Sequence, residues 1–246
     1  MAIKPDQTQQ TIQTLWSRAA SDIRGPSGNV DSVIWEHAVR VVHLTETIMA
    51  MPEVAHHVID RVALTAAALY HDAGWILDMR DGRITGEALL LKRTTDEQRE
   101  RAAAWMTTCL ADVLEPGRRR LAARIITECN DRTTHLLEAQ ILADAENLDH
   151  VGPQAVWFMV RRQLAEHRSL DEMIANWQRQ NQYGYWPLWI KESLRFPSAR
   201  RMAEERWKAM DRFMEDVRHS CALTRDEQPE HIPAATQEAT TLAVSS

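Results

Sequence analysis

Three segments of the sequence carry side chains that can bind a metal ion or move a proton. His37 lies in the first, and His71 and Asp72 are adjacent in the second, at the end of an apolar stretch. The third is another apolar stretch that contains the carboxylates Asp144 and Glu146. A single helical histidine is usually a packing or surface residue. Three separate helices that each offer a ligand type favour a metal site instead.

The chemistry of such a site follows from its donor atoms. Two neutral imidazoles and two carboxylates make a mixed nitrogen and oxygen set that suits Mn²⁺, Fe²⁺, Co²⁺ or Ni²⁺, with Zn²⁺ and Mg²⁺ as further candidates. Four protein ligands leave open positions on the ion for a water whose pKa is lowered, while the ion withdraws charge from a phosphoryl oxygen. The pattern predicts hydrolysis of a phosphate ester or anhydride.

Helices must position these residues. Only 8 of the 246 residues are glycine, and apolar residues recur at spacings of three and four between the punctuating Gly and Pro residues. We expect a polar loop over 78–94 and an aromatic linker over 183–189. The expected helices are 7–20, 33–51, 53–75, 95–115, 118–130, 136–150, 154–166, 170–180 and 198–220.

This pattern predicts one all-α domain with short additions at its ends. Residues 1–29 form an N-terminal helix and loop, and 30–221 form a single-domain helical bundle that includes the C-terminal helices. Residues 222–246 are rich in Thr, Ala, Pro and Glu without periodicity, which is typical of a disordered tail.

The order of these segments resembles that of the HD-domain metal-dependent phosphohydrolases, and in particular a small bacterial nucleotidase-like branch. His37 stands in a His-x-x-Arg-Val setting, and His71-Asp72 fits the pair that names the family. The segment 144–152 resembles the closing Asp-Ala-Asp-x-Leu-Asp-x-Ile-Gly motif, and 196–206 resembles that branch's last helix. The resemblance covers about residues 30–220.

This resemblance implies an HD-fold bundle whose metal ligands are His37, His71, Asp72 and a late acid. In the family the second acid of the closing motif usually binds the metal, which points to Glu146, whereas helical geometry leaves Asp144 and Glu146 on opposite flanks of the apolar face. Both acids stay candidates. Residues 98–102 contain no histidine, and Cys129-Asn130 stands where some relatives carry another. We therefore expect one metal ion.

Residues for substrate binding and proton transfer can also be named. Arg40 follows His37 by three positions on the same side of a helix, and Lys92 and Arg93 lie on the loop after the His-Asp pair. Guanidinium groups bind phosphate oxygens in a bidentate manner. We expect all three to contact the substrate, and Asp72 to act as the catalytic residue that accepts a hydrogen bond from the attacking water.

Charge and cysteine usage restrict partners and location. The net charge of -6 argues against a nucleic-acid polymer as a partner. Cys109, Cys129 and Cys221 are widely spaced and form no CxxC pair, which fits a reducing cytoplasm. No apolar run approaches the 18 residues of a membrane span, so we expect no membrane partner. A homo-oligomer stays open.

Three functions compete. The first is a metal-dependent phosphohydrolase that acts on a small phosphorylated metabolite, a nucleotide in the favoured case. The second is a catalytically degenerate HD-fold protein that binds a metal or ligand for regulation, suggested by the absent histidines and by Glu146. The third and weakest is an HD-type oxygenase or lyase.

Overall fold

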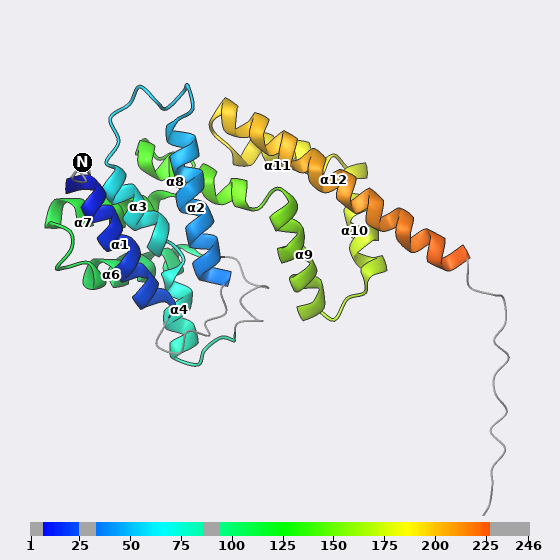
Figure 1. The fold of residues 1–246 in the computed structure, drawn as a ribbon, viewed down its shortest axis with the longest axis horizontal. Helices are drawn as coiled ribbons and strands as arrows, with labels where there is room; N and C mark the ends of the chain where they lie inside the picture. Colours follow the sequence, from blue (N-terminus) through cyan, green and yellow to red (C-terminus); the bar gives the residue numbers. More distant parts are fainter. Residues whose placement is uncertain (1–6, 25–32, 86–93, 227–246) are drawn as a thin grey trace, which may run out of the picture.

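The computed structural model describes residues 7–24, 33–85 and 94–226, and every regular element in these ranges is a helix (Figure 1). This confirms the predicted all-α class. The helices are α1 (Gln7–Arg24), α2 (Val33–Met49), α3 (Arg61–Tyr70), α4 (Ala73–Arg80), α6 (Asp96–Cys109), α7 (Pro116–Glu128), α8 (Leu137–Asp149), α9 (Pro153–Ala165), α10 (Leu170–Gln182), α11 (Tyr185–Ser193) and α12 (Pro197–Asp226).

Helix α3 is the centre of the larger hydrophobic core. Every residue from Val62 to Tyr70 is buried, and α1, α2, α6, α7 and α8 all pack against it. The alanines 66–68 bring neighbouring helices close to its backbone, because a methyl side chain keeps little distance between helix axes. The end of α3 is therefore held rigidly from several directions.

The single helix expected over 53–75 is wrong. Asp60 caps α3, because its carboxylate accepts hydrogen bonds from the backbone N–H groups of Val62 and Ala63 at 3.1 and 3.0 Å. The helix ends at Tyr70, and α4 begins at Ala73. The break leaves His71 and Asp72 at the junction of two helices.

Gly74 lies inside α4, near the end of the helix expected over 53–75. A Cβ atom there would come within 2.5 Å of the backbone oxygen of Gln98, so only glycine lets α4 approach α6 this closely. Part of the loop expected over 78–94 is also helical, since α4 continues to Arg80. Thr95 caps α6 at the start of the helix expected over 95–115, with its hydroxyl accepting a hydrogen bond from the N–H of Gln98.

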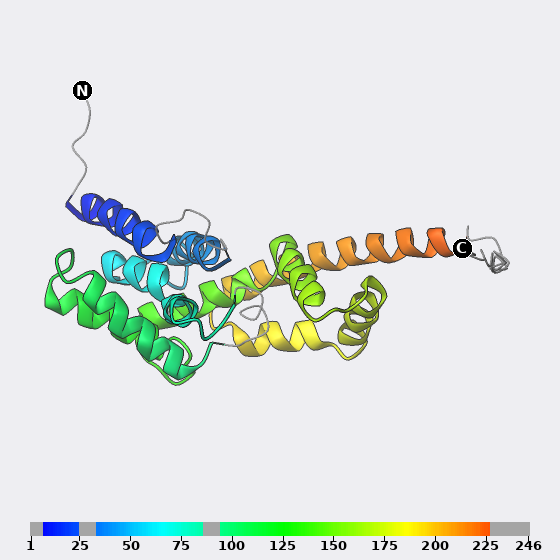
Figure 2. The same cartoon turned by 90° about the horizontal axis from the view of Figure 1, so that it is seen from below.

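The helices α9 to α12 build on a second, smaller core. Its members are Val151, Ala155, Val156, Met173, Ile174, Trp177, Met210 and Met214. The expected aromatic linker is in fact the start of α11, which begins after Gly184 in the left-handed region (φ 63°). Helix α12 is long (Figure 2) and runs to Asp226, beyond the predicted end near residue 220; the rest of the expected tail lies outside the described residues.

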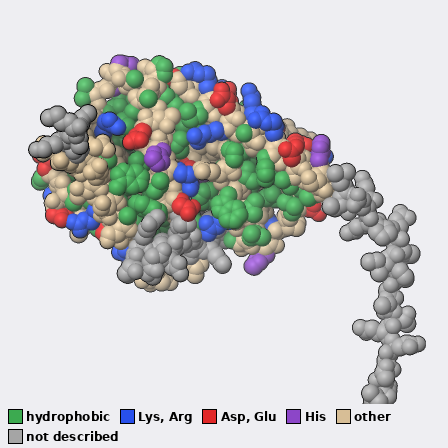
Figure 3. Space-filling view, in the orientation of Figure 1, with side chains coloured by type: hydrophobic (Ala, Val, Ile, Leu, Met, Phe, Trp, Pro, Cys, Tyr) green, Lys and Arg blue, Asp and Glu red, His purple; other side chains and the backbone are tan. Residues whose placement is uncertain are grey.

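The outer surface of these C-terminal helices is partly apolar. Trp157 and Leu164 on α9 and Leu188 on α11 are 60, 66 and 60% exposed, and Figure 3 shows hydrophobic side chains gathered over α9. No helix in the described part of the chain is both long and apolar enough to cross a membrane.

Candidate metal centre

His37, His71 and Asp72 come together at the junction of α3 and α4. His37 reaches this point from α2, and one donor atom from each of the three side chains lies within 4.8 Å of the other two. The Nε2 atoms of His37 and His71 are 3.0 Å apart. The Oδ2 atom of Asp72 lies 3.7 Å from the first of these nitrogens and 3.8 Å from the second. Both histidines are buried.

The other nitrogen of each imidazole already has a partner. The Nδ1 of His71 lies 2.7 Å from the carbonyl oxygen of Ala68, and the Nδ1 of His37 lies 2.8 Å from Oδ2 of Asp149. Both partners accept hydrogen bonds, so both Nδ1 atoms carry a proton. Each neutral ring then has its lone pair on Nε2, directed at the other ring.

This arrangement fits a metal ion. Two lone pairs 3.0 Å apart repel each other unless a proton or a cation lies between them. Nitrogen ligands about 2.1 Å from an ion and about 90° apart are themselves about 3.0 Å apart. The donor set of the chain therefore suits a divalent ion held by the two Nε2 atoms and the carboxylate of Asp72.

Asp72 is fixed by donors on its far side. Its Oδ1 accepts hydrogen bonds from Nη1 of Arg99 at 3.0 Å and from the hydroxyl of Thr94 at 3.1 Å. Its Oδ2 is consequently left facing the histidines. Burial alone would raise the pKa of Asp72, but the interaction with the neighbouring imidazole of His71 and the charge of Arg99 outweigh it and hold the pKa far below its usual value.

Arg99 joins Glu146 to this cluster. Its guanidinium is 1% exposed, donates to the carbonyl oxygen of His71 at 2.9 Å and to Oε1 of Glu146 at 2.5 Å, and so bridges Glu146 and Asp72. Burial raises the pKa of Glu146, but the charge of Arg99 more than compensates, and the pKa is lowered. Glu146 is thus a charged carboxylate at the edge of the cluster.

Asp149 lies one turn of α8 beyond Glu146 and holds His37 in place. Besides its contact with His37, it accepts hydrogen bonds from Nε and Nη2 of Arg40 at 2.7 and 2.9 Å. Burial lowers the pKa of His37, but the hydrogen bond to Asp149 and the charge of Asp72 outweigh it, so the pKa of His37 is raised. The pKa of His71 is lowered, chiefly by burial.

The predicted site residues therefore separate into groups. His37, His71 and Asp72 meet, and Glu146 is linked to them through Arg99. Arg40 is paired with Asp149 through two of its nitrogens, and its contact with a substrate stays a prediction. Lys92 and Arg93 lie outside the described residues.

Asp144 lies elsewhere, on the opposite flank of α8. Its carboxylate is fully buried and accepts hydrogen bonds from the backbone N–H groups of Arg195 and Phe196 at 2.8 to 3.0 Å, just before α12 begins. Burial raises the pKa of Asp144 to about 6 despite these hydrogen bonds. Its visible role is to anchor the α11–α12 turn.

The sequence interpretation missed three residues near the cluster. Arg99 lies in the stretch noted only for lacking a histidine, and its burial on α6 carries no signal in the sequence. Asp149 and His150 belong to the closing motif, so their place in that motif is a signal that could have found them. The ring of His150 stacks on that of His37 with centroids 6.1 Å apart.

Comparison with known proteins places the fold. No family model and no curated protein matches this sequence. YpgQ of Bacillus subtilis, solved in complex with ADP, matches 87% of this chain and 96% of its own, with a TM-score of 0.56 and 17% identity. The Lin1889 protein of Listeria innocua matches 89 and 99%, with a TM-score of 0.57 and 18% identity.

A third neighbour is a Bacillus thuringiensis protein described as an HD-superfamily hydrolase. It matches 90% of this chain and 100% of its own, with a TM-score of 0.58 and 16% identity. A likeness at such low identity shows the fold. The chain shares the all-α fold of the protein described as an HD-superfamily hydrolase, and the His-His-Asp cluster lies at the junction of α3 and α4.

Proposed function

We propose that this protein is a phosphohydrolase that uses one divalent metal ion to hydrolyse a small phosphorylated metabolite. The observation that carries the proposal is the pair of Nε2 atoms 3.0 Å apart, each on an imidazole whose Nδ1 is already bound to an acceptor. His37, His71 and Asp72 would hold the ion, and Glu146, rather than Asp144, would be the late acid. Mn²⁺, Fe²⁺, Co²⁺ and Ni²⁺ suit this donor set best.

When bound, such an ion supplies a Lewis acid for the phosphoryl group and lowers the pKa of a water. The residues of the chain orient the other participants. Arg99 and Thr94 hold Oδ1 of Asp72, so that Oδ2 is available to accept a hydrogen bond from the attacking water. Asp149 keeps the proton of His37 on Nδ1, which leaves Nε2 free as a ligand.

A nucleotide is the substrate class we favour. The neighbour YpgQ is solved with ADP, which supports this class for a chain of the same fold. Arg99 supports a single ion, because its guanidinium already supplies a positive charge between Asp72 and Glu146. Cys109 and Cys129 form no disulfide within the described part of the chain, and the cytoplasm is the location we propose.

The proposal is tested with the purified protein supplied with Mn²⁺ and a panel of nucleotides and phosphomonoesters. We expect release of phosphate or pyrophosphate that depends on the ion, together with complete loss of metal binding and turnover in His71→Ala. His57→Ala is the matched control, because it removes an exposed imidazole away from the cluster. Metal binding that persists in His71→Ala would contradict the assignment of the metal site to this cluster.

The same ion pairs of Arg99 favour a second candidate, a degenerate HD protein that binds a ligand without turnover. A buried guanidinium between two acids stabilises them in the absence of an ion. Under this alternative the wild-type protein binds Mn²⁺ with the same dependence on His71 but converts no member of the panel.

A further inference from the structure

An open cleft runs from Glu146 toward the α11–α12 turn. The part nearest Glu146 has a volume of about 500 Å³ and is lined by the end of α7, one face of α8 and the turn. A second part of about 740 Å³ shares Arg132, Ser193 and Arg195 with the first and extends to Lys191 and Arg200. We call the two parts together the basic cleft.

Positive charge dominates this cleft. Its lining carries the four cations Arg132, Lys191, Arg195 and Arg200 against the two carboxylates of Glu146 and Glu192. The whole chain has a net charge of -6, so this excess of cations is local. Such a concentration attracts small anions even on an acidic protein.

The cations of the basic cleft are only weakly compensated. Within the described part of the chain, no carboxylate lies in ion-pair range of Lys191 or Arg200. Arg132 is 3.9 Å from Glu192, a distance at which a surface pair contributes little. Arg195 lies equally far, 3.9 Å, from the carboxylate of Asp144. Charges left without a close partner are available to a ligand.

Two of these arginines are held in position by the backbone. The guanidinium of Arg195 donates to the carbonyl oxygen of Asp131 at 2.9 Å, and its own backbone N–H is bound by Asp144. The Nε of Arg200 donates to the carbonyl oxygen of Leu194 at 2.8 Å. A cation that is ordered before the ligand arrives loses less entropy on binding.

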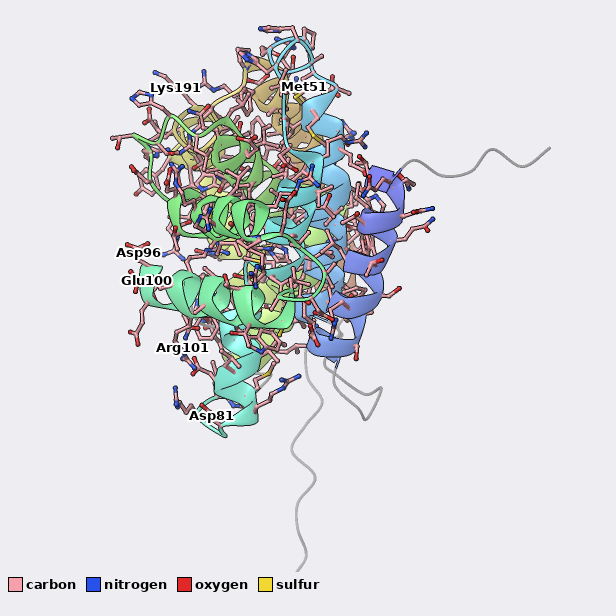
Figure 4. All side chains as sticks on the ribbon, turned by 90° about the vertical axis from the view of Figure 1, so that its left-hand side faces the viewer. Met51, Asp81, Asp96, Glu100, Arg101 and Lys191 are labelled. Carbon is pink, nitrogen blue, oxygen red and sulfur yellow. The ribbon has the colours of Figure 1, made fainter. Side chains whose placement is uncertain are left out.

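The basic cleft begins at Glu146 and opens outward. Glu146 lines its inner end and is bridged by Arg99 to Asp72. Figure 4 shows Lys191, at the outer end, on the same side of the molecule as Asp96 and Glu100 of α6, the helix that carries Arg99. A group bound to Arg132 and Arg195 therefore shares a cleft with Glu146 and lies outside the His-His-Asp cluster.

We propose that the basic cleft is an oxyanion subsite that binds a phosphate group, with Arg132 and Arg195 as its principal cations. The proposal deepens the proposed function, because it gives the substrate or product a phosphate site separate from the metal ligands. The source of the bound group is either a second phosphate of the substrate or the released product, and both present the same oxygens to the arginines.

The test measures binding of inorganic phosphate and of pyrophosphate to the full chain after treatment with a chelator, by calorimetry or ³¹P line broadening. Arg132→Gln and Arg195→Gln should each weaken binding about tenfold, the loss of one charge-assisted contact. Lys191→Gln should have a smaller effect. Arg179→Gln, an exposed change of the same charge on α10, is the matched control.

Further results decide the outcome. Binding that survives in His71→Ala supports a subsite independent of the metal centre, and binding that disappears there overturns it. Unchanged affinity in Arg132→Gln, whose exposed side chain is not needed for folding, or no binding of either anion by the wild type, also overturns it. Displacement of bound phosphate by ADP identifies a substrate phosphate as the source, and phosphate that ADP does not displace identifies the released product.

Failure of the proposed hydrolysis does not affect this measurement, because it uses neither a metal ion nor turnover. If the protein binds phosphate in the basic cleft but hydrolyses nothing, the proposed subsite stands and the proposed hydrolase activity fails. If the protein hydrolyses nucleotides but the Arg132 and Arg195 variants bind anions as the wild type does, the proposed hydrolase activity stands and the proposed subsite fails.

Discussion

The two flanks of α8 hold carboxylates only two residues apart, and the surroundings of these carboxylates are opposite. Glu146 faces the guanidinium of Arg99, which holds the pKa of Glu146 low. Asp144 faces two backbone N–H groups before α12, and burial raises its pKa to about 6. The same residue chemistry on one helix thus serves a charged cluster on one side and a chain turn on the other.

The difference shows that burial alone does not mark a metal ligand. Asp144 is the more deeply buried of the two acids and has hydrogen-bond partners for both of its oxygens. Glu146 is part-buried, and its interaction with a neighbouring cation is one that a metal ion can replace or share. The hydrogen-bond and ion-pair partners of the two carboxylates, rather than their exposed fractions, distinguish the structural role of Asp144 from the proposed metal-binding role of Glu146.

The largest expected effect is on folding. Asp144→Ala leaves the N–H groups of Arg195 and Phe196 without an acceptor in a buried turn, so the free energy of unfolding should fall by about 3 kcal/mol. Urea denaturation measures this change. Affinity for Mn²⁺ should stay within about threefold of wild type, because Asp144 lies outside the cluster. Loss of Mn²⁺ binding together with stability would mean that Asp144 also contributes to the metal centre.

The second effect is on metal affinity. Glu146→Gln keeps an acceptor for Arg99 but removes the negative charge, so Mn²⁺ affinity measured by calorimetry should fall about 100-fold. The free energy of unfolding should also fall, because the buried Arg99 keeps only Asp72 as a charged partner. Wild-type affinity in Glu146→Gln would remove this acid from the metal centre. The isosteric Asp144→Asn is the matched control.

A smaller effect is expected one turn further along α8. Asp149→Asn can still accept the hydrogen bond from Nδ1 of His37 but loses the charge that stabilises this ring and pairs with Arg40. Metal affinity should fall about tenfold. Asp78→Asn, a buried carboxylate paired with Arg101 away from the cluster, should leave metal affinity unchanged. An equal loss in both variants would indicate general destabilisation.

How much the sequence could predict differs between these features. Helical periodicity and the pattern from His37 to Glu146 were sufficient for the all-α class and for the meeting of His37, His71 and Asp72. The break after Tyr70 was missed, because the apolar run continues through it and the cap at Asp60 competes with several other polar residues.

The roles of Arg99 and Asp144 needed the structure for another reason. Each depends on partners distant in the sequence, Glu146 for the first and the backbone of Arg195 for the second, 47 and 51 residues away. Nothing in local periodicity reports such pairings. The two carboxylates of α8 therefore could not be told apart until the tertiary contacts were known.

The smallest expected effect is a pH dependence confined to the Asp144 flank. The pKa of Asp144 in the folded protein, about 6, lies above the value of about 3.9 for an unfolded aspartate. The folded state therefore binds the extra proton, and the stability it contributes is complete below about pH 4 and is lost as the pH rises through 6.

Between pH 5 and pH 7 the wild type should lose on the order of 1 kcal/mol relative to Asp144→Asn, which has no proton to release. Urea denaturation of both proteins across this range measures the difference. A difference that stays constant with pH would mean that the N–H groups of Arg195 and Phe196 keep the carboxylate ionised, and the electrostatic contrast between the two flanks of α8 would then disappear.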